Sequence, residues 1–121
     1  MVNFKCDILV EMDIKYLGHS SFKIRGKSGS VVTDPFDSKM VGVDFPRVSA
    51  EIVTVSHNHQ DHNQVSKVSG TSNRSEPFVI DRVGEYEASG IGVIGVKSWH
   101  DDEEGSKRGE NIIYVIQVEG V

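Results

Sequence analysis

The sequence predicts a strand-rich α/β (α+β) domain, and three observations support this prediction. Apolar residues mostly alternate with polar ones or form short β-branched runs, a pattern typical of strands. Glycine and polar residues bound these runs, as they do at turns. The chain has 121 residues, 37% hydrophobic and 26% charged, which is enough for one domain with its own core.

The first predicted element is an antiparallel β-meander. Apolar residues alternate on either side of residues 18–20, which predicts two strands joined by a tight turn. The turn residues at 25–29 then lead into a third strand at 31–33. Asp34 and Pro35 end this strand, because proline has no N–H group to donate to the ladder.

A loop is expected next, extending through residues 46–49, and a short apolar strand at 52–55 follows it. This strand stops abruptly at a polar segment rich in histidine. The best helix candidate of the whole chain lies just beyond, at 63–68, and residues 70–76 form a loop rich in serine, threonine and asparagine.

The second half of the chain predicts another meander of strands, at residues 78–80, 83–88, 91–98 and 112–118. A charged connection separates the last two. Residues 1–11 are expected to be a loosely ordered N-terminal extension, as chain ends often are, so that residues 12–121 form the domain.

Composition excludes several classes of protein. The formal net charge of −5 argues against nucleic acid held by bulk charge. The longest apolar runs are far shorter than the ~20 residues that span a bilayer, so no membrane segment is expected. The N-terminus lacks the uninterrupted apolar stretch of a secretory signal, and Cys6, the single cysteine, has no partner for an internal disulfide. A cytoplasmic location is therefore expected.

Three of the five histidines lie within six positions, in the pattern His-x-His-x-Asp-His at His57, His59, Asp61 and His62. On an extended backbone the i, i+2 spacing places the first two imidazoles on the same side. Imidazole and carboxylate groups are zinc ligands, and a polar loop at a strand end can hold them without burying an unpaired charge. The pattern predicts a site for two adjacent metal ions.

The string HNHQDH at 57–62 resembles the signature of the metallo-β-lactamase superfamily. The segments YLGHSSF at 16–22, TDPF at 33–36 and SWHD at 98–101 narrow the resemblance to small metal-dependent hydrolases related to the ascorbate-phosphate lactonases. The resemblance runs from about residue 12 to the C-terminus. It implies the N-terminal half of the family's αββα sandwich.

This resemblance implies specific roles for the histidine cluster. His57 and His59 would bind the first metal together with His100, and Asp61 and His62 would serve the second. The resemblance implies up to two ions, with zinc as the expected occupant and manganese or iron as alternatives.

Four further residues have two interpretations each. Asp34 would accept the free N–H of a ligand imidazole, or it would simply begin an Asp-Pro turn. His19 would line the pocket or would be a structural residue of its turn. Lys107 and Arg108 would bind a phosphate or carboxylate group of the substrate, or would lie on a solvated loop.

The implied activity is hydrolysis of a small ester, lactone or phosphorylated substrate by a metal-activated water, with Asp61 as a ligand that also orients this water or accepts its proton. A non-catalytic metal-binding or assembly module is the alternative. A nuclease is less favoured, because the chain is acidic and lacks a basic stripe with interleaved aromatic residues.

Members of the resembling family are considerably longer than this chain and have a pseudo-duplicated second half, which adds a bridging aspartate and a last histidine to the site. A half-sandwich alone would expose an apolar face and an unpaired strand edge. We therefore expect either a missing C-terminal half or a homo-oligomer that completes the fold.

Overall fold

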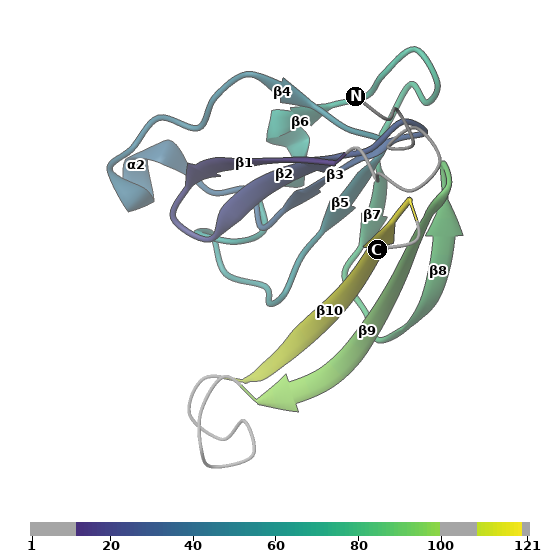
Figure 1. Ribbon diagram of the computed structural model, residues 1–121. Helices are drawn as coiled ribbons and strands as arrows, with labels where there is room; N and C mark the ends of the chain where they lie inside the picture. The colour runs from purple at the N-terminus through teal and green to yellow at the C-terminus, as the bar shows by residue number, and fades with distance from the viewer. Residues whose placement is uncertain (1–11, 100–108, 120–121) are drawn as a thin grey trace, which may run out of the picture.

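The computed structural model describes residues 12–99 and 109–119, which form two β-sheets stacked face to face (Figure 1). The larger sheet has the strand order β1-β2-β3-β5-β7, the smaller sheet has the order β10-β9-β8, and β4 and β6 form a separate pair. The strands are β1 Asp13–Gly18, β2 Ser21–Arg25, β3 Ser30–Thr33, β4 Val48–Ser49, β5 Ile52–Thr54, β6 Val68–Ser69, β7 Phe78–Ile80, β8 Gly84–Ala88, β9 Ile91–Trp99 and β10 Glu110–Val118. This architecture confirms the strand-rich prediction.

The first three strands form the antiparallel meander that the alternation predicts. Tyr16 pairs with Phe22 and Ile14 with Ile24 across β1 and β2. Antiparallel pairing continues from β2 to β3. Local alternation and turn residues are sufficient to define this part of the fold.

The second half of the larger sheet differs from the prediction, because β7 does not belong to a second meander. It lies parallel to β5, which is itself parallel to β3. All three residues of β5 are buried, as expected for a strand covered on both faces. Only β8, β9 and β10 form the antiparallel second meander.

Helices are few and short. The helix α2 covers Ser38–Val41 within the segment expected to be a loop, and the Asp37 side chain caps it by accepting the Lys39 N–H. The helix expected at 63–68 is only a 3₁₀ turn, η1, at Val65–Lys67. It gives way to β6, where Val68 is buried and pairs with Val48. No helix of the described segments is long and apolar enough to cross a membrane.

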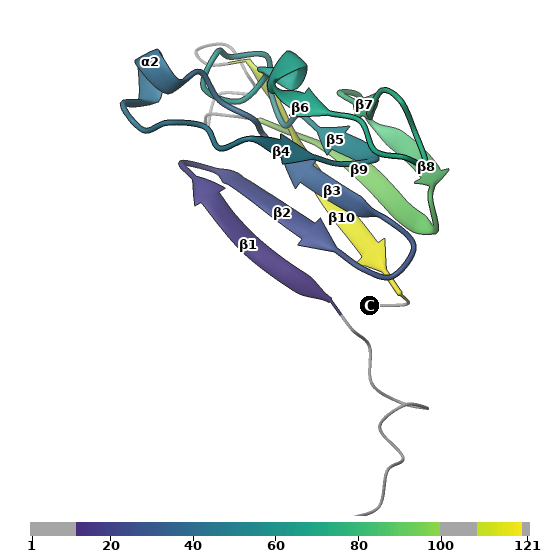
Figure 2. The same ribbon diagram turned by 90° about the horizontal axis from the view of Figure 1, so that it is seen from above.

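Two apolar clusters cover the two faces of the larger sheet. Seen from above in Figure 2, β4 and β6 lie on one face and β9 and β10 on the other. The cluster between the two sheets contains Val31, Ile52, Ile80, Ile91, Val93 and Val118. The cluster beneath β4 and β6 contains Leu17, Val32, Ala50, Val53, Val55 and Val68. Thus the central strands are buried on both faces.

Two apolar surfaces remain exposed in the described part of the chain. One lies on β1 and β2 and consists of Ile14, Tyr16 and Phe22. These side chains share a face of the sheet with Ile24, which packs against the inter-sheet core. The other lies on the outer face of the smaller sheet and consists of Ile94, Val96, Ile113 and Val115. Within the described chain, β10 pairs only with β9, so one edge of β10 borders the first surface.

Candidate metal centre

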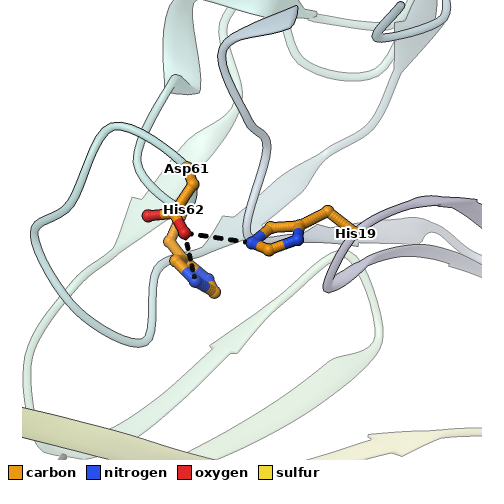
Figure 3. A group of neighbouring side chains, drawn as sticks. All are labelled: His19, Asp61 and His62. Carbon is orange, nitrogen blue, oxygen red and sulfur yellow. Dashed lines mark hydrogen bonds and ion pairs between the residues drawn. The ribbon is translucent and has the colours of Figure 1, made fainter. Parts of the chain in front are cut away.

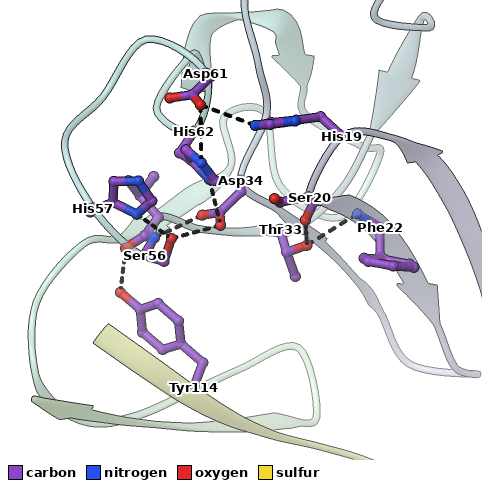
Figure 4. Close-up of polar contacts among 11 residues, drawn as sticks. His19, Ser20, Phe22, Thr33, Asp34, Ser56, His57, Asp61, His62 and Tyr114 are labelled. Carbon is purple, nitrogen blue, oxygen red and sulfur yellow. Dashed lines mark hydrogen bonds and ion pairs between the residues drawn. The ribbon is translucent and has the colours of Figure 1, made fainter. Parts of the chain in front are cut away.

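The site forms where two parallel strands end together. Thr33 of β3 and Thr54 of β5 are paired, so the residues that follow them, Asp34 and Ser56, meet at the same edge of the sheet (Figure 4). Asp34 adopts a left-handed backbone with φ of 42°, and its N–H donates to the carbonyl of Thr54. The strand ends therefore place a carboxylate beneath the histidine loop.

Asp34 accepts three hydrogen bonds, two from Ser56 and one from a histidine. Its Oδ1 accepts the Ser56 backbone N–H at 2.7 Å. Its Oδ2 accepts the Ser56 hydroxyl at 2.7 Å and contacts His62 Nδ1 at 3.1 Å. Thus Asp34 contacts an imidazole of the histidine cluster, and it also lies directly before Pro35 at the end of β3.

Counting protons in this network determines the tautomers of two histidines. An ionised carboxylate only accepts hydrogen bonds, so His62 Nδ1 must carry a proton, and a neutral His62 then has a lone pair on Nε2. The Ser56 hydroxyl donates its proton in the hydrogen bond to Asp34. Its oxygen therefore accepts a hydrogen bond from His57 Nδ1 at 2.9 Å. A neutral His57 therefore also has a lone pair on Nε2.

The loop at 57–62 is a series of turns and not the extended backbone that the i, i+2 spacing suggests. The His59 N–H donates to the His57 carbonyl, and the His62 N–H donates to the His59 carbonyl. These turns bring the rings together, with centroids 4.6 Å apart for His57 and His59 and 3.9 Å apart for His57 and His62. The prediction of a shared side was based on the wrong backbone, although the rings do meet.

Asp61 lies between two imidazoles from distant parts of the chain (Figure 3). Its Oδ2 lies 3.0 Å from His19 Nε2 and 3.3 Å from His62 Nε2. Partial burial raises the pKa of Asp61, but the hydrogen bond from His19 and the charge of His62 outweigh it and hold the pKa below its usual value. Asp61 is accordingly an ionised carboxylate at neutral pH.

Two sets of three donors share this carboxylate. His57, His59 and Asp61 form one set, and His19, Asp61 and His62 form the other; within each set the donor atoms lie within 4.8 Å of one another. Ligands at 2.0–2.1 Å around a tetrahedral zinc ion lie ~3.3 Å apart, which matches the His62 to Asp61 separation. A divalent cation bound at this spacing would be coordinated by His62 Nε2 and Asp61 Oδ2 together. The donors thus fit divalent cations.

A cavity of about 660 Å³ opens beside His57 and His59. Arg82 is the only lysine or arginine in its described lining, and it forms an ion pair with Asp81 at 3.3 Å. The other lining residues are Val55, Ser56, Asn58, Asn63, Val65, Val79, Gly109, Glu110 and Ile112. The cavity has room for a small molecule next to the first donor set.

The structure brings together most of the residues that the sequence predicts for the site. His19, Asp61 and His62 meet, whereas the predicted His100, Lys107 and Arg108 lie outside the described residues. Sequence reasoning missed Ser56, which hydrogen-bonds both Asp34 and His57. Its position directly before the first histidine was the available signal.

Residues 13–121 match the family described as the beta-lactamase superfamily domain. The chain is also 35% identical over 54 residues to a UPF0173 metal-dependent hydrolase from Methanosphaera stadtmanae, covering 42% of this chain and 23% of the relative. It is 31% identical over 71 residues to one from Salinibacter ruber, covering 57% and 30%. These matched segments are under a third of each curated relative.

Solved structures share the fold. A candidate Zn-dependent hydrolase of the metallo-β-lactamase superfamily from Thermotoga maritima aligns with a TM-score of 0.67 and 35% identity, covering 92% of this chain and 46% of that one. The diiron β-hydroxylase CmlA from Streptomyces venezuelae aligns with a TM-score of 0.53 and 17% identity, covering 89% and 28%, which is a likeness of fold. The chain therefore belongs to the metallo-β-lactamase superfamily and spans about half the length of its Thermotoga relative.

Proposed function

We propose that this protein is a metal-dependent hydrolase, or part of one, that acts on a small ester, lactone or phosphorylated substrate. The observation that carries the proposal is the pair of three-donor sets sharing Asp61 beside a cavity of about 660 Å³. The relatives named metal-dependent hydrolases support the same reaction class.

Within this proposal the first ion is held by His57 and His59, with His100 from outside the described residues, and the second by Asp61 and His62. Zinc is the proposed occupant of both sites, because imidazole and carboxylate donors suit it. Manganese and iron are the alternatives, since the same donor types bind them and CmlA, which shares the fold, is a diiron enzyme.

A bound divalent cation would polarise the scissile carbonyl or phosphoryl group and acidify nearby water. The chain's own residues then have separate tasks. Asp34 holds His62, and Ser56 holds His57, in the tautomer that leaves the lone pair on Nε2 for the metal. The ionised Asp61 carboxylate orients the attacking water and accepts its proton at an oxygen atom.

The cavity lining suggests how a substrate would be held. Arg82 presents a guanidinium group and Asn58 an amide beside the first donor set, and both can bind oxygen atoms of a polar substrate. Lys107 and Arg108, outside the described residues, stay proposed contacts for an anionic group. A cytoplasmic location is part of the proposal, because the chain has a single cysteine.

We propose that the apolar surface of Ile14, Tyr16 and Phe22 is covered either by a missing C-terminal half or by a second copy of the chain that pairs through β10. Antiparallel pairing of two identical edge strands is automatically two-fold symmetric, and it would also satisfy the open edge of β10. If a second copy covers this surface, light scattering should give the mass of a dimer. A stable, cooperatively folded monomer would contradict this.

Metal content and turnover together test the function. The purified chain should bind close to two zinc ions, as measured by elemental analysis, and should hydrolyse a lactone or a phosphodiester. Binding without turnover would favour the alternative, a metal-binding module, since the chain covers 46% of the Thermotoga protein. No binding would overturn both functions.

A further inference from the structure

We propose that His19 is the third protein ligand of the second metal ion, so that His19, Asp61 and His62 form a metal site contained within this chain. The inference rests on the proposed metal-dependent function. It assigns a ligand to the turn between β1 and β2, where His19 lies 42 residues before Asp61 in the sequence.

The turn holds His19 in an unusual backbone conformation. His19 has φ of 48°, in the left-handed region that non-glycine residues rarely adopt, and Gly18 before it has φ of 120°. The Tyr16 hydroxyl donates to the His19 carbonyl at 2.8 Å and fixes the turn. Residues kept in such sparsely populated conformations cluster at functional sites, because the surrounding structure must hold them there.

The imidazole of His19 lies edge-on to Phe36, with ring centroids 6.2 Å apart, and it points at Asp61 (Figure 3). Its Nε2 lies 3.0 Å from Asp61 Oδ2, the same oxygen that His62 Nε2 approaches at 3.3 Å. Both separations are close to the ~3.3 Å edge of a tetrahedral zinc site. Three donors from three positions thus converge on one small volume.

The three donors are placed so that one cation can contact all of them. Asp34 contacts His62 Nδ1 at 3.1 Å and so turns His62 Nε2 toward the Asp61 carboxylate. His19 Nε2, Asp61 Oδ2 and His62 Nε2 offer one donor atom each within the spacing of a metal site. About a third of the His19 side chain is exposed, so an ion can reach the site from solvent.

Zinc titration of the metal-free chain tests the assignment. The matched variants are His19→Asn and His59→Asn, with zinc alone as the probe. Asparagine tolerates the left-handed conformation, so the turn is preserved, and thermal unfolding without metal checks that both variants fold. The wild-type chain should bind two ions. In His19→Asn the dissociation constant of one ion should rise by at least ~100-fold, more than a group outside the ligand set contributes.

The outcomes separate the two proposals. His59→Asn should lose the other ion, and the double variant should bind neither tightly. If His19→Asn retains two ions with affinities within ~100-fold of the wild type, His19 only hydrogen-bonds Asp61 and the assignment is wrong, while the metal-dependent function stands. If the wild-type chain binds no zinc, the proposed function itself fails.

Discussion

Replacing Asp34 by asparagine tests the hydrogen-bond network beneath the metal centre. Asp34 is 8% exposed, and its two oxygens accept from the Ser56 N–H, the Ser56 hydroxyl and His62 Nδ1. An amide has only one acceptor oxygen, so its NH₂ group must face at least one of these donors. The substitution keeps the size of the side chain and changes its hydrogen bonding and its charge.

The magnitude follows from the number of hydrogen bonds lost. The least damaging orientation keeps the amide oxygen at the Oδ2 position and loses the bond from the Ser56 N–H. A hydrogen bond to a charged group contributes ~1.5–3 kcal/mol, and an unsatisfied buried donor adds to the cost, so the free energy of unfolding should fall by about 2–4 kcal/mol. Zinc affinity should also fall ~10–100-fold, because a neutral amide oxygen at His62 Nδ1 does not raise the basicity of the ligand imidazole as a carboxylate does.

Urea denaturation with and without chelator measures the first effect, and zinc titration measures the second. Asp37→Asn is the matched control, because Asp37 only caps α2 and asparagine caps a helix about as well as aspartate. The control should retain the wild-type zinc affinity. A zinc dissociation constant within twofold of the wild type in Asp34→Asn would refute the role assigned to the Asp34 carboxylate.

Three further predictions concern other residues. Ser56→Ala should weaken zinc binding by ~10-fold, because an acceptor for an imidazole N–H is lost; an unchanged titration curve would contradict this. Tyr114→Phe should lower the free energy of unfolding by ~1–2 kcal/mol, measured in urea, since the Tyr114 hydroxyl donates to two backbone carbonyls. Burial raises the pKa of Glu51, but hydrogen bonds from Thr71 and Ser30 outweigh it and hold the pKa below its usual value. The stability that Glu51 contributes is therefore present above the pKa of the unfolded carboxyl group and is lost as the pH falls through the lowered pKa of the folded state. Melting curves of Glu51→Gln between neutral and acidic pH should lack this component.

Local patterns were informative wherever neighbouring residues decide the structure. Alternation and glycine turns predicted β1 to β3, because hairpins form between adjacent segments. The predicted helix at 63–68 is mostly absent, since burial of Val68 against the core extends the backbone there. Packing overrode a weak local preference for helix.

The sequence by itself determined the strand-rich class and the histidine cluster, because periodicity and the spacing of ligand residues are local properties of the chain. Only the tertiary structure decided that β3 and β5 are parallel, which brings Asp34 to Ser56. It also decided that His19 reaches Asp61. Both contacts depend on pairing between distant segments, and the energy of such pairing comes from burying shared apolar faces, which no single segment of the sequence encodes.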